Sequence, residues 1–195
     1  MAGHFEALPG GGAAVALDEV EVSILRSLAV QLMELIGPGD EPVEGEDPLA
    51  ALFAEGPSEA PSDPALKRLF PDAYADESDE LRSASADFRR YTENDLRTGK
   101  REHVLAVIRS LDALTPEGEG DEVVLKLTAD ESRAWLGALN DLRLTIGTRL
   151  EVTDEDEGGE LYRLPDSDPR KPMVLAYLWL GALQESLVET LLSGA

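Results

Sequence analysis

Two stretches of this sequence share one pattern, in which a short apolar segment is followed by a capping box and a long amphipathic run. Asp18 with Glu21 and Thr128 with Glu131 have the three-residue separation of a capping box, which satisfies backbone N–H groups at the start of a helix. After each box, apolar residues recur every three or four positions, which predicts a helix with one buried side. A Gly-Pro pair at residue 37 ends the first of these helices.

Periodicity and helix-stop signals predict six helices in all. We expect them over residues 18–36, 65–70, 76–97, 100–114, 129–150 and 168–192. Gly99 separates the third from the fourth. The third is expected to direct these side chains to the core: Leu81, Ala84, Phe88, Tyr91 and Leu96. The last is apolar nearly all round, which is typical of a helix at the centre of a bundle or in a homodimer interface.

Three short segments have the features of β-strands. Residues 5–8 and 13–17 flank a Pro-Gly-Gly-Gly turn and predict a hairpin, and residues 123–127 alternate apolar with charged side chains. The predicted fold class is therefore mainly α, a helical bundle with a small antiparallel β-sheet formed by the N-terminal hairpin and a strand near 122–127. The length fits a single domain over residues 1–195.

The formal net charge of −23 is concentrated in a few segments. Of the 40 acidic residues, 18 lie in three stretches rich in proline or glycine, at 37–64, 116–122 and 151–160. This composition predicts a disordered acidic insertion over 37–64 and an acidic loop over 151–160. The surplus charge repels phosphate backbones, so we expect the whole molecule to bind DNA only weakly without another partner.

The chain contains no cysteine, which excludes disulfides, thiolate metal sites and thiol redox switching within it. The N-terminus lacks the basic and then apolar stretch of a secretory signal. The longest acid-free apolar run, residues 173–183, is shorter than the roughly 20 residues that cross a bilayer. We therefore expect a soluble cytoplasmic protein that does not enter membranes.

Residue patterns that support covalent chemistry are missing from the sequence. The two histidines, His4 and His103, are far apart, and no nucleophile elbow or HExxH motif occurs. The acidic run at 154–157 suggests a calcium loop, but Pro165 stands where an EF-hand needs glutamate. We predict no catalytic residues, no metal site and no cofactor, and hence a protein that is not an enzyme.

Two polar clusters are candidate binding sites. The first is cationic and consists of Arg89, Arg90, Arg97, Lys100 and Arg101. It predicts a nucleic-acid or acidic-partner surface, and the alternative is a charged helix surface joined by pairs such as Arg89 with Glu93. The second cluster interrupts an otherwise apolar helix and consists of Asn140, Asp141, Arg143 and Arg149. Its members either connect helices inside the fold or present a partner site.

Six segments, in order, resemble an actinobacterial family of oxidative-stress transcriptional regulators (AosR-like), long catalogued as a domain of unknown function. They read GGGAAVAL, LRSLAVQLMELI, DPALKRLFPDAY, FRRYTENDLRTGK, WLGALNDLRLTIGTRL and YLWLGALQESLVETLL. The resemblance covers nearly the whole chain except the acidic insertions. It implies a role in oxidative stress and cysteine biosynthesis, exerted through an RNA polymerase sigma factor and promoter DNA.

One difference limits what the resemblance implies. The described regulator senses oxidants through paired cysteines, and this chain has none, so the sensing step does not carry over. What remains is the binding step or a different input. Our first hypothesis is a non-enzymatic transcriptional regulator that binds a sigma factor or promoter DNA. The alternative is an adaptor or scaffold in protein turnover or cysteine biosynthesis, which the family's gene neighbourhood favours.

Overall fold

A computed structural model describes residues 3–38, 56–74, 78–114, 122–153 and 163–193 of the chain. Within them lie three strands and five helices, where six helices were predicted, and the predicted mainly α fold class with a small sheet is confirmed. The elements are β1 (Glu6–Leu8), β2 (Gly12–Asp18), α1 (Glu19–Ile36), α3 (Pro64–Leu69), α4 (Asp79–Asp112), β3 (Glu122–Leu127), α5 (Ala129–Arg149) and α7 (Lys171–Ser193).

The three strands form one antiparallel sheet in the order β1-β2-β3, which confirms the predicted hairpin and the predicted third strand. Ala13 pairs with Leu127 and Asp18 with Glu122, so β3 runs along the whole of β2. The turn between β1 and β2 has Gly10 and Gly11 at φ angles of 95° and 84°, which favour glycine.

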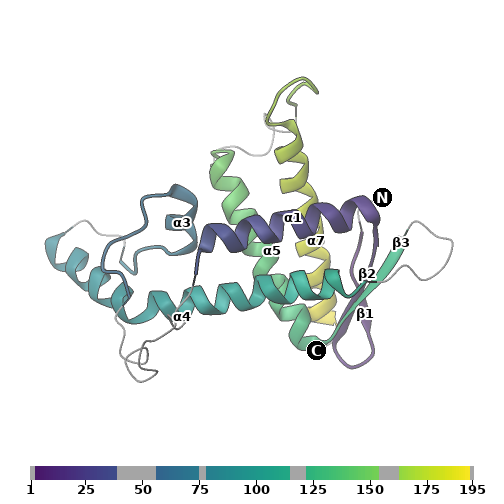
Figure 1. Cartoon of the computed structure of the whole chain (residues 1–195), viewed down its shortest axis with the longest axis horizontal. Helices are drawn as coiled ribbons and strands as arrows, with labels where there is room; N and C mark the ends of the chain where they lie inside the picture. The colour runs from purple at the N-terminus through teal and green to yellow at the C-terminus, as the bar shows by residue number, and fades with distance from the viewer. Residues whose placement is uncertain (1–2, 39–55, 75–77, 115–121, 154–162, 194–195) are drawn as a thin grey trace.

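The helices form two crossed pairs, shown in Figure 1. Helices α1 and α4 lie antiparallel to each other, and α5 and α7 form a second antiparallel pair that crosses them steeply. Helix α5 is central, because it packs against α1, α3, α4 and α7 as well as the sheet. The last helix, α7, packs on α5 and the sheet, while Met173 and Leu175 are exposed to solvent.

Local capping signals act where the sequence predicted them. Asp18 and Glu21 exchange hydrogen bonds with each other's backbone at the start of α1, and Thr128 and Glu131 do the same at the start of α5. Asp63 accepts hydrogen bonds from the first turn of α3, which begins with a proline. Because each box lies next to a strand, β2 leads directly into α1 and β3 into α5.

The prediction of two helices separated near Gly99 was wrong, because α4 continues through this residue for 34 residues. Glycine in a helix interior costs only about 1 kcal/mol relative to alanine. Packing of the surrounding turns against α1 and α5 is enough to offset that cost. Gly99 is therefore a tolerated helix residue and not a helix end.

Alanine at position 99 should raise the free energy of unfolding by about 0.5–1 kcal/mol, because it restores helix propensity. A methyl group there would meet no atom within 4 Å. Gly10 is an equally open position, but its φ of 95° should make Gly10→Ala destabilising. Urea unfolding of both variants tests the continuous helix, and a loss of stability in Gly99→Ala would contradict it.

The prediction of which side of α4 faces the core is also wrong for the N-terminal half of this helix. Phe88, Tyr91 and Leu96 are 51%, 68% and 49% exposed, whereas Arg89 and Glu93 are 4% and 2% exposed. This half of α4 extends beyond α5 (Figure 1), and its Arg89 contacts Phe70, at the end of α3, and Asp72. The groups it meets there are carbonyls and a carboxylate, which arginine can satisfy and an aromatic ring cannot.

The predicted disordered insertion, 37–64, falls largely on residues 39–55, which lie outside the described residues. Its described ends are both attached to α4. Arg101 of α4 donates a hydrogen bond to the carbonyl of Gly37, and the N–H of Gly56 lies 2.8 Å from the carbonyl oxygen of Arg90. Most of the predicted acidic loop, 151–160, also lies outside the described residues. None of the described helices combines the length and the apolar character needed to cross a membrane.

Candidate functional site

The N-terminal half of α4 encloses a carboxylate between two arginines. Glu93 accepts hydrogen bonds from Arg89 and Arg97, one helical turn before and after it, and the Arg97 bond is 2.6 Å long. The Nη2 atom of Arg89 also lies 2.9 Å from the Oδ1 atom of Asp72. Burial alone lowers the pKa of Arg89, but hydrogen bonds to Asp72 and Glu93 outweigh burial and raise that pKa. The two carboxylates therefore stabilise the charged form of the Arg89 guanidinium inside the fold.

The same arginines satisfy carbonyl groups at the ends of two other helices. Arg97 donates to the carbonyl of Ile36, the last residue of α1, and its guanidinium lies 4.5 Å from the centroid of the Phe70 ring. Arg89 donates to the carbonyl of Phe70, at the end of α3, over 3.0 Å. The last turn of α1 has no basic residue of its own, so α4 supplies the cation that this end of a helix favours.

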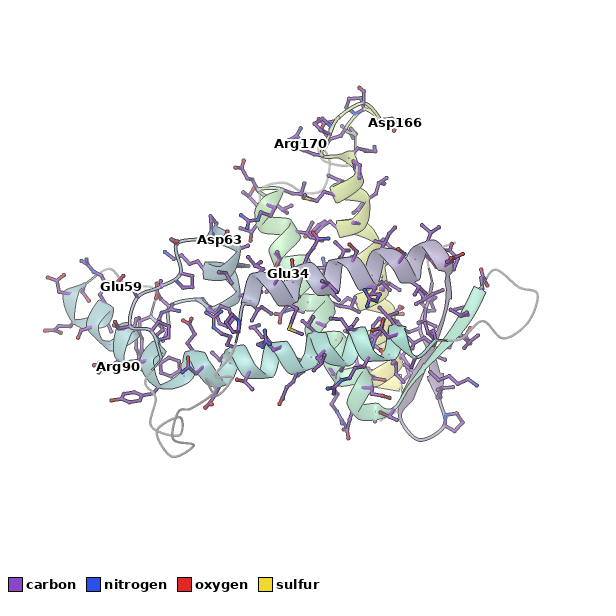
Figure 2. The ribbon with its side chains drawn as sticks, viewed as in Figure 1. Glu34, Glu59, Asp63, Arg90, Asp166 and Arg170 are labelled. Carbon is purple, nitrogen blue, oxygen red and sulfur yellow. The ribbon has the colours of Figure 1, made fainter. Side chains whose placement is uncertain are left out.

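The other cationic residues predicted to bind a partner differ in their exposure. The Nζ atom of Lys100 lies 2.7 Å from the Oδ1 atom of Asp141, a buried residue of α5. Arg90 pairs with Asp87 on the projecting end of α4, where Figure 2 labels it. All five predicted cationic residues, Arg101 included, thus make contacts within the protein.

The second predicted cluster, on α5, is spread over several interfaces instead of forming one patch. Asp141 joins α5 to α4 through Lys100. Arg149 joins α5 to the start of α3, with its Nη2 atom 2.7 Å from the Oδ2 atom of Asp63. This hydrogen bond is the main cause that lowers the pKa of Asp63 below its ordinary value. These two members of the cluster connect helices.

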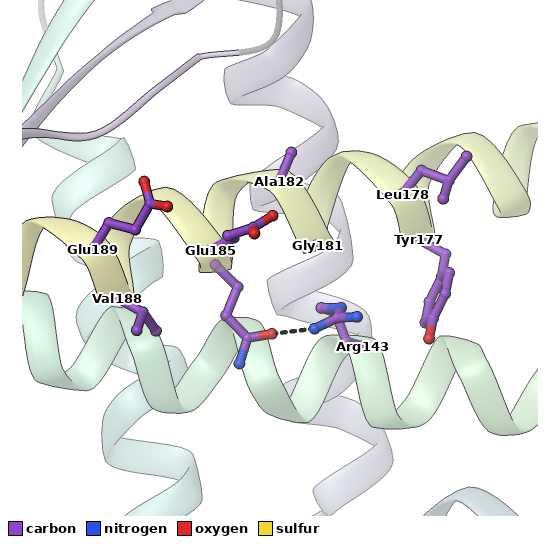
Figure 3. A pocket seen from close by; sticks show the side chains of 9 residues that line it. Arg143, Tyr177, Leu178, Gly181, Ala182, Glu185, Val188 and Glu189 are labelled. Carbon is purple, nitrogen blue, oxygen red and sulfur yellow. Dashed lines mark hydrogen bonds between the residues drawn. The ribbon is translucent and has the colours of Figure 1, made fainter. Parts of the chain in front are cut away.

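The remaining two members, Asn140 and Arg143, face α7. The Nη1 atom of Arg143 lies 2.6 Å from the Oε1 atom of Gln184, and the amide nitrogen of Gln184 lies 3.5 Å from the Oδ1 atom of Asn140. Figure 3 shows the Arg143 guanidinium beside Tyr177, and its central carbon is 5.3 Å from the centroid of the Tyr177 ring. Arg143 is thus held on two sides by α7.

Arg143 and Tyr177 line two grooves of the molecule. One, of about 720 Å³, lies along α7 and has these further lining residues: Leu178, Gly181, Ala182, Gln184, Glu185, Val188 and Glu189. The other, of about 560 Å³, lies towards the C-terminal end of α5, and Arg68 and Glu151 contribute to it. Volumes of this size suit small-molecule ligands.

A third surface is the outward side of α4 in its N-terminal half, formed by Phe88, Tyr91 and Leu96, which we call the aromatic face. All three side chains are about half exposed or more. The guanidinium carbon of Arg90 lies 5.6 Å from the centroid of the Tyr91 ring. Exposed apolar side chains that gather on one element, next to a cation, are typical of a protein-binding surface.

The described residues contain no group of three or more histidine, aspartate or glutamate side chains that could hold a metal ion. The described carboxylates with a lowered pKa, at Asp63, Asp112 and Asp168, each have an arginine partner. Such pairs stabilise the ionised carboxylate and so do not produce the raised pKa of a general acid. In the described part of the chain, the geometry supports binding.

A family model described as a domain of unknown function, DUF2017, matches residues 2–191, nearly the full length of the chain. The chain belongs to this family. Family membership agrees with the resemblance carried by the six sequence segments. The DUF2017 match also spans every described helix and strand except the last two residues of α7, so the whole fold described above belongs to the family.

Curated relatives of this DUF2017 chain come from mycobacteria. The putative oxidative stress regulator AosR of Mycobacterium leprae is 33% identical over 181 residues, which cover 89% of this chain and 79% of the relative. The oxidative stress regulators AosR of Mycobacterium tuberculosis H37Rv and of Mycobacterium bovis are each 32% identical to this chain over 183 residues. The aligned residues cover 88% of this chain and 78% of each relative. No solved structure matches the chain.

Several residues of these surfaces were missed by sequence reasoning. Glu93 had a usable signal, since it lies four residues from each of two arginines on one helix. Tyr177 and Gln184 had none, because they are more than 30 residues from Arg143 in the sequence and only the packing of α7 on α5 brings them to it.

Proposed function

We propose that this DUF2017 protein is a non-enzymatic regulator of the oxidative-stress response that acts by binding a protein of the transcription machinery. The observation that carries the proposal is 32–33% identity, over 88–89% of the chain, to proteins named oxidative stress regulators. The geometry supports a binding role, because the candidate surfaces offer apolar and paired polar groups. The partner implied by the family resemblance is an RNA polymerase sigma factor.

The aromatic face is the surface that we assign to this partner. Phe88 and Tyr91 are exposed, and the N-terminal part of α4 extends beyond the crossed helices (Figure 1), so a partner can reach these side chains without displacing another helix. The net charge of −23 favours a partner segment that carries basic residues beside an apolar side. Aromatic side chains that become buried contribute a large part of the free energy of association.

Direct binding of promoter DNA is less well supported than binding of a protein. Arg89 is 4% exposed, and Arg97 and Lys100 contact Glu93 and Asp141. A phosphate contact would require these cations to leave their carboxylates, whereas nonspecific affinity for DNA depends on free cations. We therefore place any contact with DNA in a complex that also contains the protein partner.

The test measures binding of the purified principal sigma factor by biolayer interferometry, with wild-type protein and with the double variant Phe88→Ser, Tyr91→Ser. We expect the double variant to weaken binding at least about a hundredfold, since removal of two aromatic anchors costs about 2 kcal/mol or more at each position. Leu175→Ser is the matched control, because Leu175 is similarly exposed but lies on α7.

Three results would contradict the proposal. The first is the absence of sigma-factor binding by the wild-type protein at low and physiological salt. The second is equal loss of binding in the control Leu175→Ser and in the double variant, which would remove the aromatic face as the site. The third is a gel shift of promoter DNA by the protein alone that weakens steeply with salt, because it would show that free cations bind phosphate.

A further inference from the structure

The two edges of the sheet differ in how the described chain covers them. Beside β1, the N–H of Phe5 lies 3.2 Å from the Oγ atom of Ser186, and the hydroxyl of Thr190 donates to the carbonyl of Phe5 over 3.0 Å, so α7 satisfies the backbone there. At the other edge β3 is the outermost strand, and no described strand pairs with its outer side (Figure 1). Every second residue of such a strand directs its N–H and C=O groups away from the sheet. Within the described residues, this edge is open to a further strand.

The side chains of β3 alternate between the two faces of the sheet. Its odd-numbered residues are buried or partly buried on the core face, whereas Glu122, Val124 and Lys126 are exposed on the other face. Neither Glu122 nor Lys126 forms an ion pair with a described residue. Glu122 lies directly opposite Asp18 of β2, and like charges in this position destabilise a sheet. A cation on the open side of Glu122 would therefore be favourable.

The sequence of β3 is complementary to itself when two copies of the strand pair antiparallel. A two-fold axis beside Val124 sets this side chain, which is 56% exposed, opposite the Val124 of the second copy. The same register sets Glu122 opposite the Lys126 of the second copy, and Lys126 opposite the Glu122 of the second copy. On the core face, Val123 comes to lie opposite Leu125. Opposite charges and apolar side chains thus meet along the strand, which stabilises such a pair.

Neighbouring registers do not give this match. A shift by one residue turns the core face of one copy towards solvent. An axis beside Val123 sets Glu122 opposite Val124, and an axis beside Leu125 sets Val124 opposite Lys126, so the charges do not pair in either register. The side chains therefore select the register about Val124.

We propose that a second copy of this chain adds to the open edge of β3, so that the sheets of the two copies join into one continuous antiparallel sheet. Backbone hydrogen bonds of the new strand pair supply the attraction, and the two pairs of Glu122 with Lys126 set the register. The net charge of −23 on each copy opposes association. At about 0.15 M salt, however, exposed charges farther apart than about 8 Å are largely screened, so the contacts at the edge decide.

Sedimentation velocity of the full chain, over about 5 to 500 µM and at about 0.15 M salt, measures the association. We expect a reversible monomer–dimer equilibrium with a Kd on the order of 10–100 µM, since one short strand pair is a small interface of the transient type.

Charge reversal tests the register at two exposed positions. Glu122→Lys and Lys126→Glu, each alone, set like charges opposite each other, so each should weaken dimerisation at least about tenfold. An equimolar mixture of the two variants should dimerise again, because each lysine then lies opposite a glutamate of the other chain. The double variant should dimerise as the wild type does, for the same reason. Lys67→Glu, which reverses an exposed lysine of α3, is the matched control and should change the Kd less than about twofold.

Cross-linking tests the position of the axis. The chain contains no cysteine, so Val124→Cys introduces a single thiol. A bismaleimide with a span of about 8 Å should link two copies of this variant, since directly opposite residues on paired strands have Cβ atoms about 5 Å apart. Leu175→Cys, at a similarly exposed position of α7, is the control and should stay unlinked.

The proposal is overturned if the chain stays monomeric at about 500 µM, which would show that Lys126 protects the edge from pairing. It is also overturned if the single charge-reversal variants dimerise as well as the wild type, or if their mixture does not dimerise. Cross-linking of Leu175→Cys without cross-linking of Val124→Cys would place the interface on α7 and overturn it as well. The sigma-factor experiment is independent of these outcomes, because it concerns α4.

Discussion

Replacing Glu93 with alanine should lower the free energy of unfolding by about 3–5 kcal/mol, which is a large part of the stability of a typical domain. Among the described residues, the loss of this carboxylate removes one of the two acids that pair with Arg89, and the one that pairs with Arg97. Arg89 is 4% exposed, so water cannot replace the lost partner. Urea unfolding followed by circular dichroism measures the effect.

Two comparisons show whether buried charge is the cause of that loss. Asp87→Ala removes the exposed partner of Arg90 on the same helix and should cost less than about 1 kcal/mol. Replacing Arg89 and Glu93 together with methionine should regain part of the stability, because the fully buried Arg89 charge is then removed with its partner, while the part-buried Arg97 still loses Glu93. If Glu93→Ala costs no more than Asp87→Ala, Glu93 is not enclosed as described.

The second large effect is expected at Trp135, whose replacement by alanine should cost about 3–5 kcal/mol. Its side chain is fully buried, lies edge-on to Phe5 with ring centroids 6.1 Å apart and donates a hydrogen bond of 2.9 Å to the hydroxyl of Ser110. It therefore joins α5 to α4 and to the segment before β1. Thermal unfolding should show a lower Tm with the same helical content at low temperature.

The conservative variant Trp135→Phe separates the two contributions of this residue. It keeps most of the packing and loses the hydrogen bond to Ser110, so we expect a cost of about 1–3 kcal/mol. A cost of Trp135→Ala below about 1 kcal/mol would be typical of a surface substitution and would contradict the central position of α5.

The parts of the fold that sequence reasoning predicted correctly depend on local signals. The capping boxes at Asp18 and Thr128 involve residues three positions apart, and the hairpin depends on a glycine turn. Local signals could not predict that α4 continues through Gly99. Intrinsic preference favours an end there, and only packing against α1 and α5 reverses it.

The inverted side of α4 has a different cause. Phe88 and Tyr91, three residues apart, lie on one side of the helix. Arg89 and Glu93, four residues apart, lie on another side. Both pairs fit a helix, and hydrophobicity favours the aromatic one as the buried side. What decides between them is the presence of Asp72 and of the Phe70 carbonyl on the neighbouring segment, which only the tertiary structure shows.

The sequence predicted the candidate sites only in part, because only the tertiary structure shows which residues lie next to one another. The sequence singled out Arg143 as a polar interruption in an apolar helix, but it placed Arg143 with Asp141 and Arg149 in one cluster. In the folded chain these residues point to three different elements. A helix distributes neighbouring residues around its axis, so closeness in sequence does not create one site.

The attachment of Gly37 and Gly56 to α4 has a consequence for how this family can change in length. Both ends of the intervening stretch are held on one rigid helix, so the core does not depend on how many residues connect them. Doubling the length of a connection costs only about 0.6 kcal/mol in closure entropy. We therefore expect insertions and deletions at this place to cost little free energy of folding.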